Sequence, residues 1–286
     1  MQIVTNSGAD LSESQRKGLA IHYAPLRITL SGKTYEGENE LSGEEFYKLL
    51  SETEDYPMTS QASAGDFAKI YQNLAKKGEK ILSVHISSGL SGTLNSAKVG
   101  AAMVPEADVT FWDTKTLSAA QGWQVQAAAI AAKKGWSLER ILERLTLIRD
   151  QVTGMFTLKE MRYLIHGGRV SHLKGLMASV LNIKPVITVD IASGKYATAA
   201  QTVTFKRAIA QIVELNAEKY GSQKLRTQIV QGLCPDGIEF LKQKMSERLD
   251  CFFEETVPVA PALGAHTGPS LTGLISGPMS LFADLL

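Results

Sequence analysis

The sequence predicts an α/β protein made of two α/β domains, the first with a mostly parallel sheet flanked by helices and the second with a mixed sheet. Up to about residue 150, short runs rich in β-forming residues alternate with helical patterns, as they do in parallel sheets. Beyond that point a glycine-rich loop and a hairpin signal change the pattern. A chain of 286 residues also exceeds what one hydrophobic core usually supports. We therefore predict domains at residues 1–155 and 156–286.

In the first domain, apolar runs bounded by polar loops predict strands, and longer amphipathic runs predict helices. We expect strands at residues 2–6, 21–28 and 109–112, and a further strand beginning at residue 81. Helices are expected at residues 11–20, 43–51, 64–76, 92–103, 119–133 and 138–149. Ser31 and Gly32 predict a hairpin turn within residues 29–35, and residues 57–63 are expected to be a polar loop.

In the second domain, the order of elements is less regular. Strands are expected at residues 152–157, 183–190, 195–201, 227–231 and 252–257, and helices at residues 158–165, 204–218 and 237–248. Residues 191–194, with sequence IASG, predict the turn of a β-hairpin. From residue 264 onwards the chain is rich in Gly, Ser and Pro, and no helix or strand is assigned to it.

The bulk composition excludes several classes of protein. Thirty basic and 29 acidic residues give a net charge of +1, so no electrostatic argument favours nucleic acid or an anionic membrane. The two cysteines form no zinc pattern and no CxxC motif, which favours a reducing, cytoplasmic compartment. The N-terminal segment lacks the features of a signal peptide, and no apolar run reaches the ~20 residues needed to cross a bilayer. We expect a soluble cytoplasmic protein without stable membrane insertion.

Three loops rich in hydroxyl residues follow predicted strands, at residues 59–61, 87–93 and 113–118. We expect them at the same edge of one sheet, where α/β proteins bind ligands. Hydroxyl groups can donate several hydrogen bonds to a carboxylate, and a helix beginning near Gly92 would favour an anion. The same Ser and Thr residues could instead be ordinary helix caps. Taken together, the loops predict an anion pocket built around Ser87, Ser88, Ser91, Gly92 and Thr93.

A second possibility is a stand-alone enzyme. Residues 89–93 partly match the G-x-S-x-G nucleophile elbow, but Thr93 replaces the second glycine. His266 could act as the base for Ser91 in a small serine hydrolase, and a relative of sugar-ketone kinases is a further alternative. The loop around Arg169 could clamp a phosphate or a carboxylate. No Walker A motif, no GxGxxG fingerprint and no metal-ligand spacing is present, so no cofactor is predicted.

Six segments resemble the motifs of one family, in the order in which the family carries them. They are VTNSGADL (residues 4–11), TSQAS (59–63), ISSGLSGT (86–93), YLIHGGRVS (163–171), NIKPV (182–186) and GAHTGP (264–269). Each motif is weak by itself, but the set spans nearly the whole chain. The sequence resembles the DegV family, which includes the fatty-acid-binding subunits of bacterial fatty acid kinase.

The resemblance implies a function in bacterial phospholipid synthesis. A long-chain fatty acid would lie in a buried tunnel between the domains and within the second, with its carboxylate held by Thr59, Ser91 and His266. Arg169 would face the phosphate and the kinase partner. A separate ATP-dependent kinase would convert the bound carboxylate to an acyl phosphate, so this subunit would not itself be catalytic. The pocket loops would be supported by Ser60, Ser88, Gly92, Thr93 and Gly268, and the acyl preference would be set by side chains such as Met177, Leu181 and Ile187.

The sequence departs from the family pattern at several positions. The usual TDSTAD opening is TNSGAD here, with Asn6 and Gly8 substituted, and Ala62 replaces the proline of TSQPS. Gln201 stands where many members carry an arginine. If that arginine engages the kinase, partnership with a standard kinase subunit is in question, whereas binding of the acyl chain is not.

Overall fold

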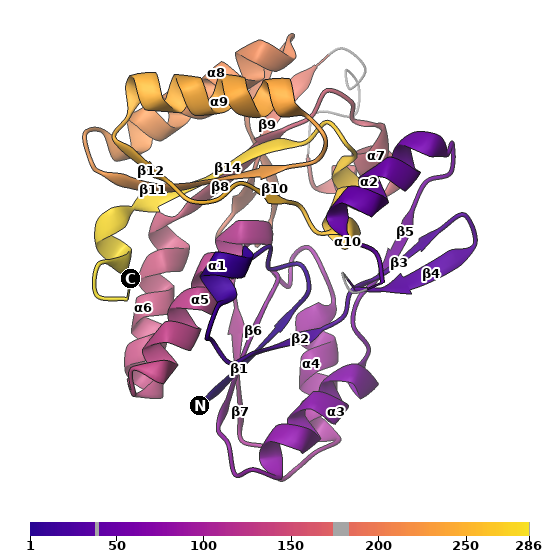
Figure 1. The fold of residues 1–286 in the computed structure, drawn as a ribbon, viewed down its shortest axis with the longest axis vertical. Helices are drawn as coiled ribbons and strands as arrows, with labels where there is room; N and C mark the ends of the chain where they lie inside the picture. The colour runs from indigo at the N-terminus through magenta and orange to yellow at the C-terminus, as the bar shows by residue number, and fades with distance from the viewer. Residues whose placement is uncertain (38–39, 174–182, 286) are drawn as a thin grey trace.

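The structure is a computed structural model that describes residues 1–37, 40–173 and 183–285. Two α/β layers are stacked along the long axis of the molecule, and a small antiparallel sheet lies at one side of their junction (Figure 1). The fold class predicted from the sequence is confirmed, since one main sheet is parallel and the other is mixed. The division at residues 155 and 156 stays a prediction.

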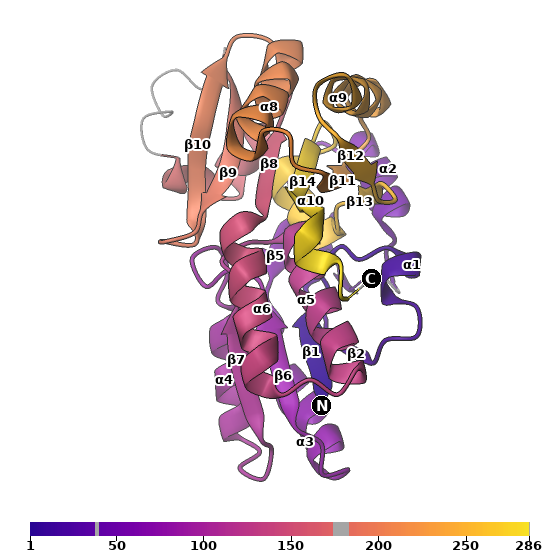
Figure 2. The ribbon, with the colours of Figure 1, turned by 90° about the vertical axis from the view of Figure 1, so that its left-hand side faces the viewer.

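The parallel sheet has the strand order β2-β1-β6-β7. Its strands are β1 (Gln2–Asn6), β2 (Ile21–Ala24), β6 (Ile81–His85) and β7 (Val109–Asp113). Successive side chains point to opposite faces of a strand. Ile3 and Leu82 accordingly belong to an apolar cluster with side chains of α5 (Ser118–Lys133) and α6 (Leu138–Gln151). Figure 2 shows these two helices beside the parallel sheet. Val4 and Ile81 pack in a separate cluster with side chains of α3 (Ala64–Ala75) and α4 (Thr93–Ala102). Helices on both faces explain why every residue of β6 is buried.

The small sheet accounts for two corrections and confirms one predicted turn. The strand expected at residues 21–28 is broken at Pro25 into β2 and β3 (Arg27–Leu30), because proline cannot donate to a strand ladder. Strand β3 pairs with β4 (Lys33–Glu36) through the predicted turn, where Ser31 and Gly32 both have positive φ. It also pairs with β5 (Met58–Ser60), so the segment expected to be only a loop contains an edge strand.

The predicted helix at residues 11–20 is much shorter than expected. Only α1 (Glu13–Arg16) forms, with Ser12 as its N-cap in a capping box with Gln15. Gly18 has a φ of +71°, which ends the helical path. The later helix α2 (Gly43–Glu52) matches its prediction and begins with another capping box, between Ser42 and Glu45.

The mixed sheet has the strand order β10-β9-β8-β14-β11-β12, with β13 also paired to β11. Its strands are β8 (Thr153–Thr157), β9 (Lys184–Asp190), β10 (Lys195–Thr202), β11 (Leu225–Gln231), β12 (Cys251–Phe253), β13 (Val257–Pro258) and β14 (Thr272–Pro278). The predicted hairpin between β9 and β10 is confirmed, whereas the strand expected at residues 252–257 is divided into β12 and β13. Two helices, α8 (Phe205–Tyr220) and α9 (Pro235–Arg248), cover the outer face (Figure 1).

The C-terminal segment, to which no element was assigned, contributes the centre of this sheet. Strand β14 lies between β8 and β11, and all seven of its residues are buried. Because glycine and proline have low β-propensity, the sequence pattern of this segment does not predict a strand. Gly273 is required by packing, since a Cβ there would lie 2.7 Å from Cγ2 of Val230. The short helix η2 (Met279–Phe282) follows.

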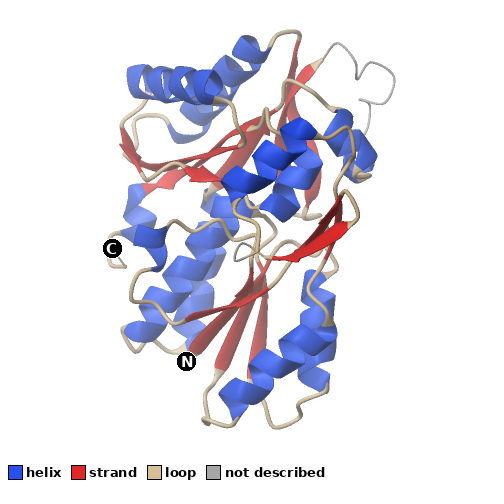
Figure 3. Cartoon of the chain, turned by 45° about the vertical axis from the view of Figure 1, so that its right-hand side comes forward, coloured by secondary structure: helices blue, strands red, loops and turns tan. Residues whose placement is uncertain are grey.

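Helix α10 (Pro261–Thr267) was missed for the same reason. Pro261 occupies its first position and Gly268 its C-cap, an arrangement that is typical of helix ends. The small sheet, α2 and α10 share one apolar cluster, which includes Phe46, Tyr47 and Ala265. This cluster also contains Tyr163 of α7 (Arg162–His166), which precedes the short helix η1 (Arg169–His172). Figure 3 shows α2 and the small sheet side by side near the junction of the two layers.

Candidate functional site

A cavity of about 370 Å³ lies at the junction of the two layers. Its polar lining comes from β5 and the residue after it, the loop after β6, η1 and α10. The residues are Thr59, Ser60, Gln61, Ser91, Gly92, Arg169 and His266. Its apolar lining consists of Leu26, Ile86, Leu90, Leu117, Tyr196, Ala262 and Leu263. Ser60, Gln61 and Gly92 are exposed, so this end of the cavity reaches the surface.

Thr59 and His266 meet directly in this cavity. Oγ1 of Thr59 lies 2.9 Å from Nε2 of His266, a hydrogen bond whose direction depends on the imidazole tautomer. Thr59 is held at the middle of β5, where it pairs with Ile28, and His266 is in the last turn of α10. Burial, and then the positive charge of Arg169, lower the pKa of His266 to about 4. The imidazole is therefore neutral at pH 7, and its Nδ1 has no partner within the described parts of the chain.

Ser91 lines the same cavity but is bonded within its own loop. Its Oγ lies 2.8 Å from Oγ1 of Thr93 and accepts a hydrogen bond from the backbone N–H of Thr93. A serine hydrolase requires a hydrogen bond between nucleophile and base. Here Nε2 of His266 is bonded to Thr59 instead of Ser91, so the geometry gives no support to the hydrolase alternative.

The loop after β6 packs against the segment after β5. A Cβ at Gly92 would lie only 2.3 Å from Oε1 of Gln61, so a side chain there would have to displace the amide of Gln61. The amide of Gln61 in turn donates to Oγ of Ser96, one turn into α4. These contacts bring Thr59 and Ser91 to one cavity. Thr59 lies in β5 and Ser91 in the loop after β6, and these two strands belong to different sheets. The expectation that all three hydroxyl-rich loops share one sheet edge is therefore wrong, because β5 pairs with β3 in the small sheet.

The remaining predicted residues have various positions. Ser88 is exposed and donates to Asp113, which braces the loops after β6 and β7. Thr93 is fully buried at the start of α4, and Gly268 lies against the ring of Tyr163. These three residues do not line the cavity. Gln201 is exposed on β10.

Arg169 lies at the start of η1, where the preceding Gly168 adopts a left-handed φ of 75°. One guanidinium nitrogen donates to the carbonyl of Gly167, and the side chain is partly exposed while it lines the cavity. Its charge acts on His266 and also on Tyr196, whose pKa is raised chiefly by burial. A cation therefore stands beside the neutral donors without forming part of the Thr59–His266 hydrogen bond.

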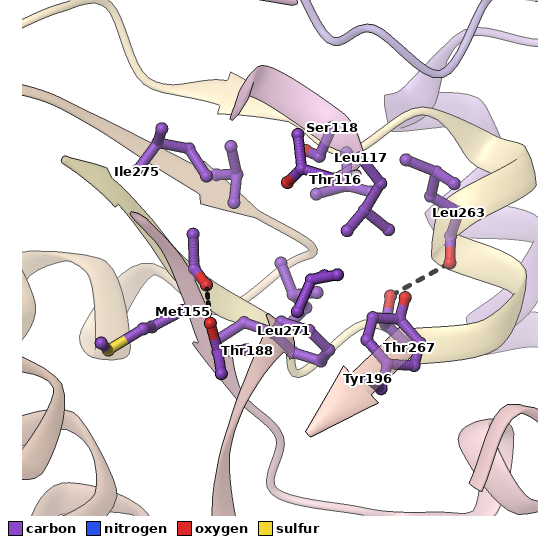
Figure 4. Close-up of a pocket in the computed structure, with 15 residues that line it drawn as sticks. Thr116, Leu117, Ser118, Met155, Thr188, Tyr196, Leu263, Thr267, Leu271 and Ile275 are labelled. Atoms are coloured by element: carbon purple, nitrogen blue, oxygen red, sulfur yellow. Dashed lines mark hydrogen bonds between the residues drawn. The ribbon is translucent and has the colours of Figure 1, made fainter. Parts of the chain in front are cut away.

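A second, narrow cavity of about 40 Å³ adjoins the first (Figure 4). The two share Leu117, Tyr196 and Leu263. Further in, the wall is almost entirely apolar and includes Phe156, Val230, Leu271 and Ile275. The polar cavity thus continues into an apolar chamber between α10 and the inner face of the mixed sheet. Of the side chains expected to set acyl preference, Ile187 is buried in the core outside this lining, and Met177 and Leu181 lie outside the described residues.

Asp10 is a supporting residue that the sequence reasoning did not single out. Its carboxylate accepts hydrogen bonds from the hydroxyl of Ser118 and from the backbone N–H of Ala260, which precedes α10. Asp10 and Ser118 both have positive φ, an unusual conformation for residues other than glycine. The carboxylate of Asp10 therefore links α10, and with it His266, to the part of the fold that is built on the parallel sheet. Its place in the VTNSGADL segment was the available signal.

Two other kinds of site were sought in the described part of the chain. No group of His, Cys, Asp and Glu side chains there could hold a metal ion. None of the helices described combines the length and apolar character that a bilayer-spanning segment needs.

Comparison with known proteins agrees with the motif pattern. Residues 1–278 match the model of the DegV family of uncharacterised proteins. A DegV domain-containing protein of Staphylococcus aureus (strain N315) is 32% identical over 274 residues, covering 96% of this chain and 97% of the relative. Another, from Deinococcus radiodurans, is 30% identical over 277 residues, covering 96% of this chain and 95% of the relative.

Solved structures give the same result for the fold. A DegV family protein from Thermus thermophilus, described as binding fatty acid, has a TM-score of 0.86 and 28% identity. The match covers 97% of this chain and 99% of that protein. DegV of Bacillus subtilis, described as a fatty acid binding protein, also has a TM-score of 0.86, with 26% identity and coverage of 97% and 98%. The motifs, the fold and these relatives together show that the chain belongs to the DegV family.

Proposed function

We propose that this protein binds a long-chain fatty acid, with its carboxylate at Thr59, Ser91 and His266 and its acyl chain in the adjoining apolar chamber. The observation that carries the proposal is the continuity of the two cavities. A polar cavity with neutral donors shares three side chains with a chamber lined by apolar groups. Solved relatives described as fatty acid binding proteins support the same ligand class.

The chemistry of the two cavities suits the two ends of such a ligand. Each buried methylene contributes about 0.8 kcal/mol, so an apolar chamber supplies affinity without specific contacts. A carboxylate accepts strong hydrogen bonds from hydroxyl and imidazole N–H groups. Because His266 is neutral at pH 7, it can donate through Nε2 to a carboxylate that displaces its bond with Thr59. These donors orient the head group without neutralising it fully.

The same site suits a carrier better than an enzyme. The polar cavity reaches the surface beside Arg169, so a bound carboxylate would be accessible to a second protein. We propose that a separate ATP-dependent kinase in the bacterial cytoplasm phosphorylates it there, and that the acyl phosphate serves phospholipid synthesis. In this scheme Arg169 faces the phosphate, and Gln201 alters the contact with the kinase. Residues 1–155 and 156–286 would be the two domains that enclose the ligand.

Native mass spectrometry of the purified protein tests lipid binding directly. We expect co-purified long-chain fatty acid at about one molecule per chain, as in an enclosed ligand pocket. His266→Ala should reduce this occupancy while the circular dichroism spectrum stays the same. Wild-type protein that contains no acyl species, and that fails to bind added palmitic acid after delipidation, would refute the proposal.

A reconstituted reaction tests the kinase partnership separately. Loaded protein, ATP and the fatty acid kinase subunit of the source organism should form an acyl phosphate that hydroxylamine traps as a hydroxamate. Arg169→Ala should slow this reaction more than it weakens acyl binding. Product formation without the kinase subunit, or hydrolysis of a p-nitrophenyl ester that depends on Ser91, would instead favour a stand-alone enzyme.

A further inference from the structure

A third cavity, of about 240 Å³, adjoins the apolar chamber on the side away from His266. It shares Thr116, Gly154, Met155, Thr188 and Val189 with the chamber, and none of its lining residues with the polar cavity. The three cavities therefore form a series, with the apolar chamber in the middle. The third cavity lies between the beginning of α5, the end of α6 and the strands β8 and β9.

The lining of this third cavity is cationic. Lys115, Arg149 and Lys219 all contribute, and among the residues that the structure describes no acidic one belongs to the lining. Lys115 is 3.1 Å from Asp113, and Arg149 has a long contact of 3.4 Å with Asp150 while it lies over the ring of Trp112. These partners compensate two of the three charges.

Lys219 differs from the other two cations. Its ammonium donates to the hydroxyl of Thr153, and no carboxylate among the described residues pairs with it. Its side chain is exposed at the surface, and partial burial of the ammonium group, which lacks a countercharge in the described part of the chain, lowers its pKa. An anion placed in the cavity would supply that countercharge.

Gly154 stands at the junction of the chamber and the cationic cavity. It lies inside strand β8, where glycine has low propensity and often marks the close approach of another group. A Cβ at this position would lie 3.3 Å from Cδ1 of Ile275 and 3.8 Å from Cβ of Ala120. The position is closely packed, so any side chain there would narrow the junction between the two cavities.

We propose that the acyl channel continues past Gly154 into the cationic cavity, and that the protein accepts long-chain acids carrying a second carboxylate at their far end. This inference rests on the proposed function, because it assumes that the first carboxylate lies at Thr59, Ser91 and His266. The methyl end of a simple fatty acid in the third cavity would face ammonium and guanidinium groups and would add little to the binding affinity. A carboxylate there would pair with Lys219 and Arg149, and the methylenes between would fill the apolar chamber.

Isothermal titration of delipidated protein tests this with palmitic acid and with tetradecanedioic, hexadecanedioic and octadecanedioic acids. We expect at least one diacid to bind within about threefold of palmitic acid or more tightly, since its second charge is paired. If every diacid binds more than about 100-fold more weakly, as a closed apolar end would require, the inference is overturned. If palmitic acid itself does not bind, the proposed function fails first.

Variants separate the third cavity from the rest of the channel. Lys219→Met should weaken the best diacid about tenfold, the value of a hydrogen bond to a charged group, and change palmitic acid by less than about twofold. Lys206→Met, on the same helix but outside the cavity, is the matched control and should change neither. Equal losses for both ligands in Lys219→Met would overturn the inference. Arg149→Gln repeats the test if Lys219→Met unfolds.

Gly154→Val tests the passage itself. Valine favours strands, and its Cβ, 3.3 Å from Cδ1 of Ile275, requires a small shift of that flexible side chain while it fills the junction. We expect the diacid to lose affinity by at least about tenfold, as when a ligand group loses its charged partner. Unchanged binding of the diacid would show that the ligand does not pass Gly154.

Discussion

Nε2 of His266 lies 2.9 Å from Oγ1 of Thr59, although the two residues are 207 positions apart in the sequence. The contact exists because α10 docks on the small sheet through the apolar cluster that includes Ala262 and Ala265. Asp10 holds the start of α10 from the parallel layer. The head-group end of the cavity is therefore assembled from three separate parts of the fold, and each can be tested.

Ser91→Ala should weaken fatty-acid binding about tenfold, because a hydrogen bond to a charged group contributes about 1.5–3 kcal/mol. Ser88→Ala is the matched control, since Ser88 lies in the same loop but bonds to Asp113 outside the cavity. Titration of both delipidated variants with palmitic acid measures the difference. Equal affinities in the two variants would remove Ser91 from the head-group site.

His266 should make the stability of the delipidated protein depend on pH in a defined window. Its pKa is about 4 in the folded state and 6.5 in the reference state, so the unfolded chain binds more protons between these values. Stability from this group is thus fully present above pH 6.5 and is lost as the pH falls toward about 4. Fully buried His85, with its pKa lowered to about 3 by desolvation, acts in the same direction.

The test compares urea unfolding across this pH range in wild type and His266→Gln. On acidification the free energy of unfolding should fall less in the variant than in wild type. The difference between the two losses should be at most on the order of 2–3 kcal/mol. Exposed His166, which lies outside the cavity lining, provides the control as His166→Gln. An NMR titration that places the pKa of His266 near 6.5 would contradict the prediction.

Glu254→Gln should destabilise the protein strongly, because its partner Arg226 is only 1% exposed. The guanidinium lies between the rings of Trp123 and Phe282, at 4.4 and 4.5 Å, and its Nε is 2.7 Å from Oε1 of Glu254. Removing the countercharge of a buried cation costs about 3–5 kcal/mol, less here because Glu254 is 15% exposed. Urea unfolding measures the change.

The control for this pair is Glu247→Gln. Glu247 pairs with Lys244 at the surface, with both side chains exposed, and such pairs contribute about 0–1 kcal/mol. If Glu254→Gln loses no more stability than Glu247→Gln, the charge of Arg226 is compensated by Gln126 instead. Oε1 of Gln126 accepts a hydrogen bond from Nη2 of Arg226.

Gly122→Ala should destabilise the protein even though alanine is the better helix former. A Cβ at Gly122, near the N-terminal end of α5, would lie 2.1 Å from the backbone carbonyl oxygen of Ala9. The backbone that leads to Asp10 would have to move, at a cost of about 1–3 kcal/mol. Gly65→Ala, at an exposed position in the first turn of α3 with no contact closer than 3.7 Å, should instead be neutral or stabilising by about 0.5–1 kcal/mol. Thermal melts of both variants would distinguish these outcomes, and equal shifts would contradict the packing argument.

Local patterns predicted the centre of the parallel sheet and one hairpin of the small sheet well. The run from β6 into α4 and the hairpin of Ser31 and Gly32 follow from signals that lie within a few residues of each other. The same patterns failed at β5 and β14, where the strand is stabilised by neighbours distant in the sequence. Gly273 lowers the β-propensity of β14, yet Val230 leaves room only for glycine there.

The sequence by itself determined the family, the α/β class and the presence of Thr59, Ser91, His266 and Arg169 in motifs that occur in a fixed order. Only the tertiary structure decided that Thr59 comes from an edge strand of a separate sheet, that His266 is half-buried and neutral, and that three cavities adjoin in series. The physical reason is that motifs are short-range, whereas burial, pKa and cavity shape depend on which distant side chains pack together. The neutrality of His266, for example, depends on Arg169 and on the docking of α10, neither of which its own neighbours in the sequence encode.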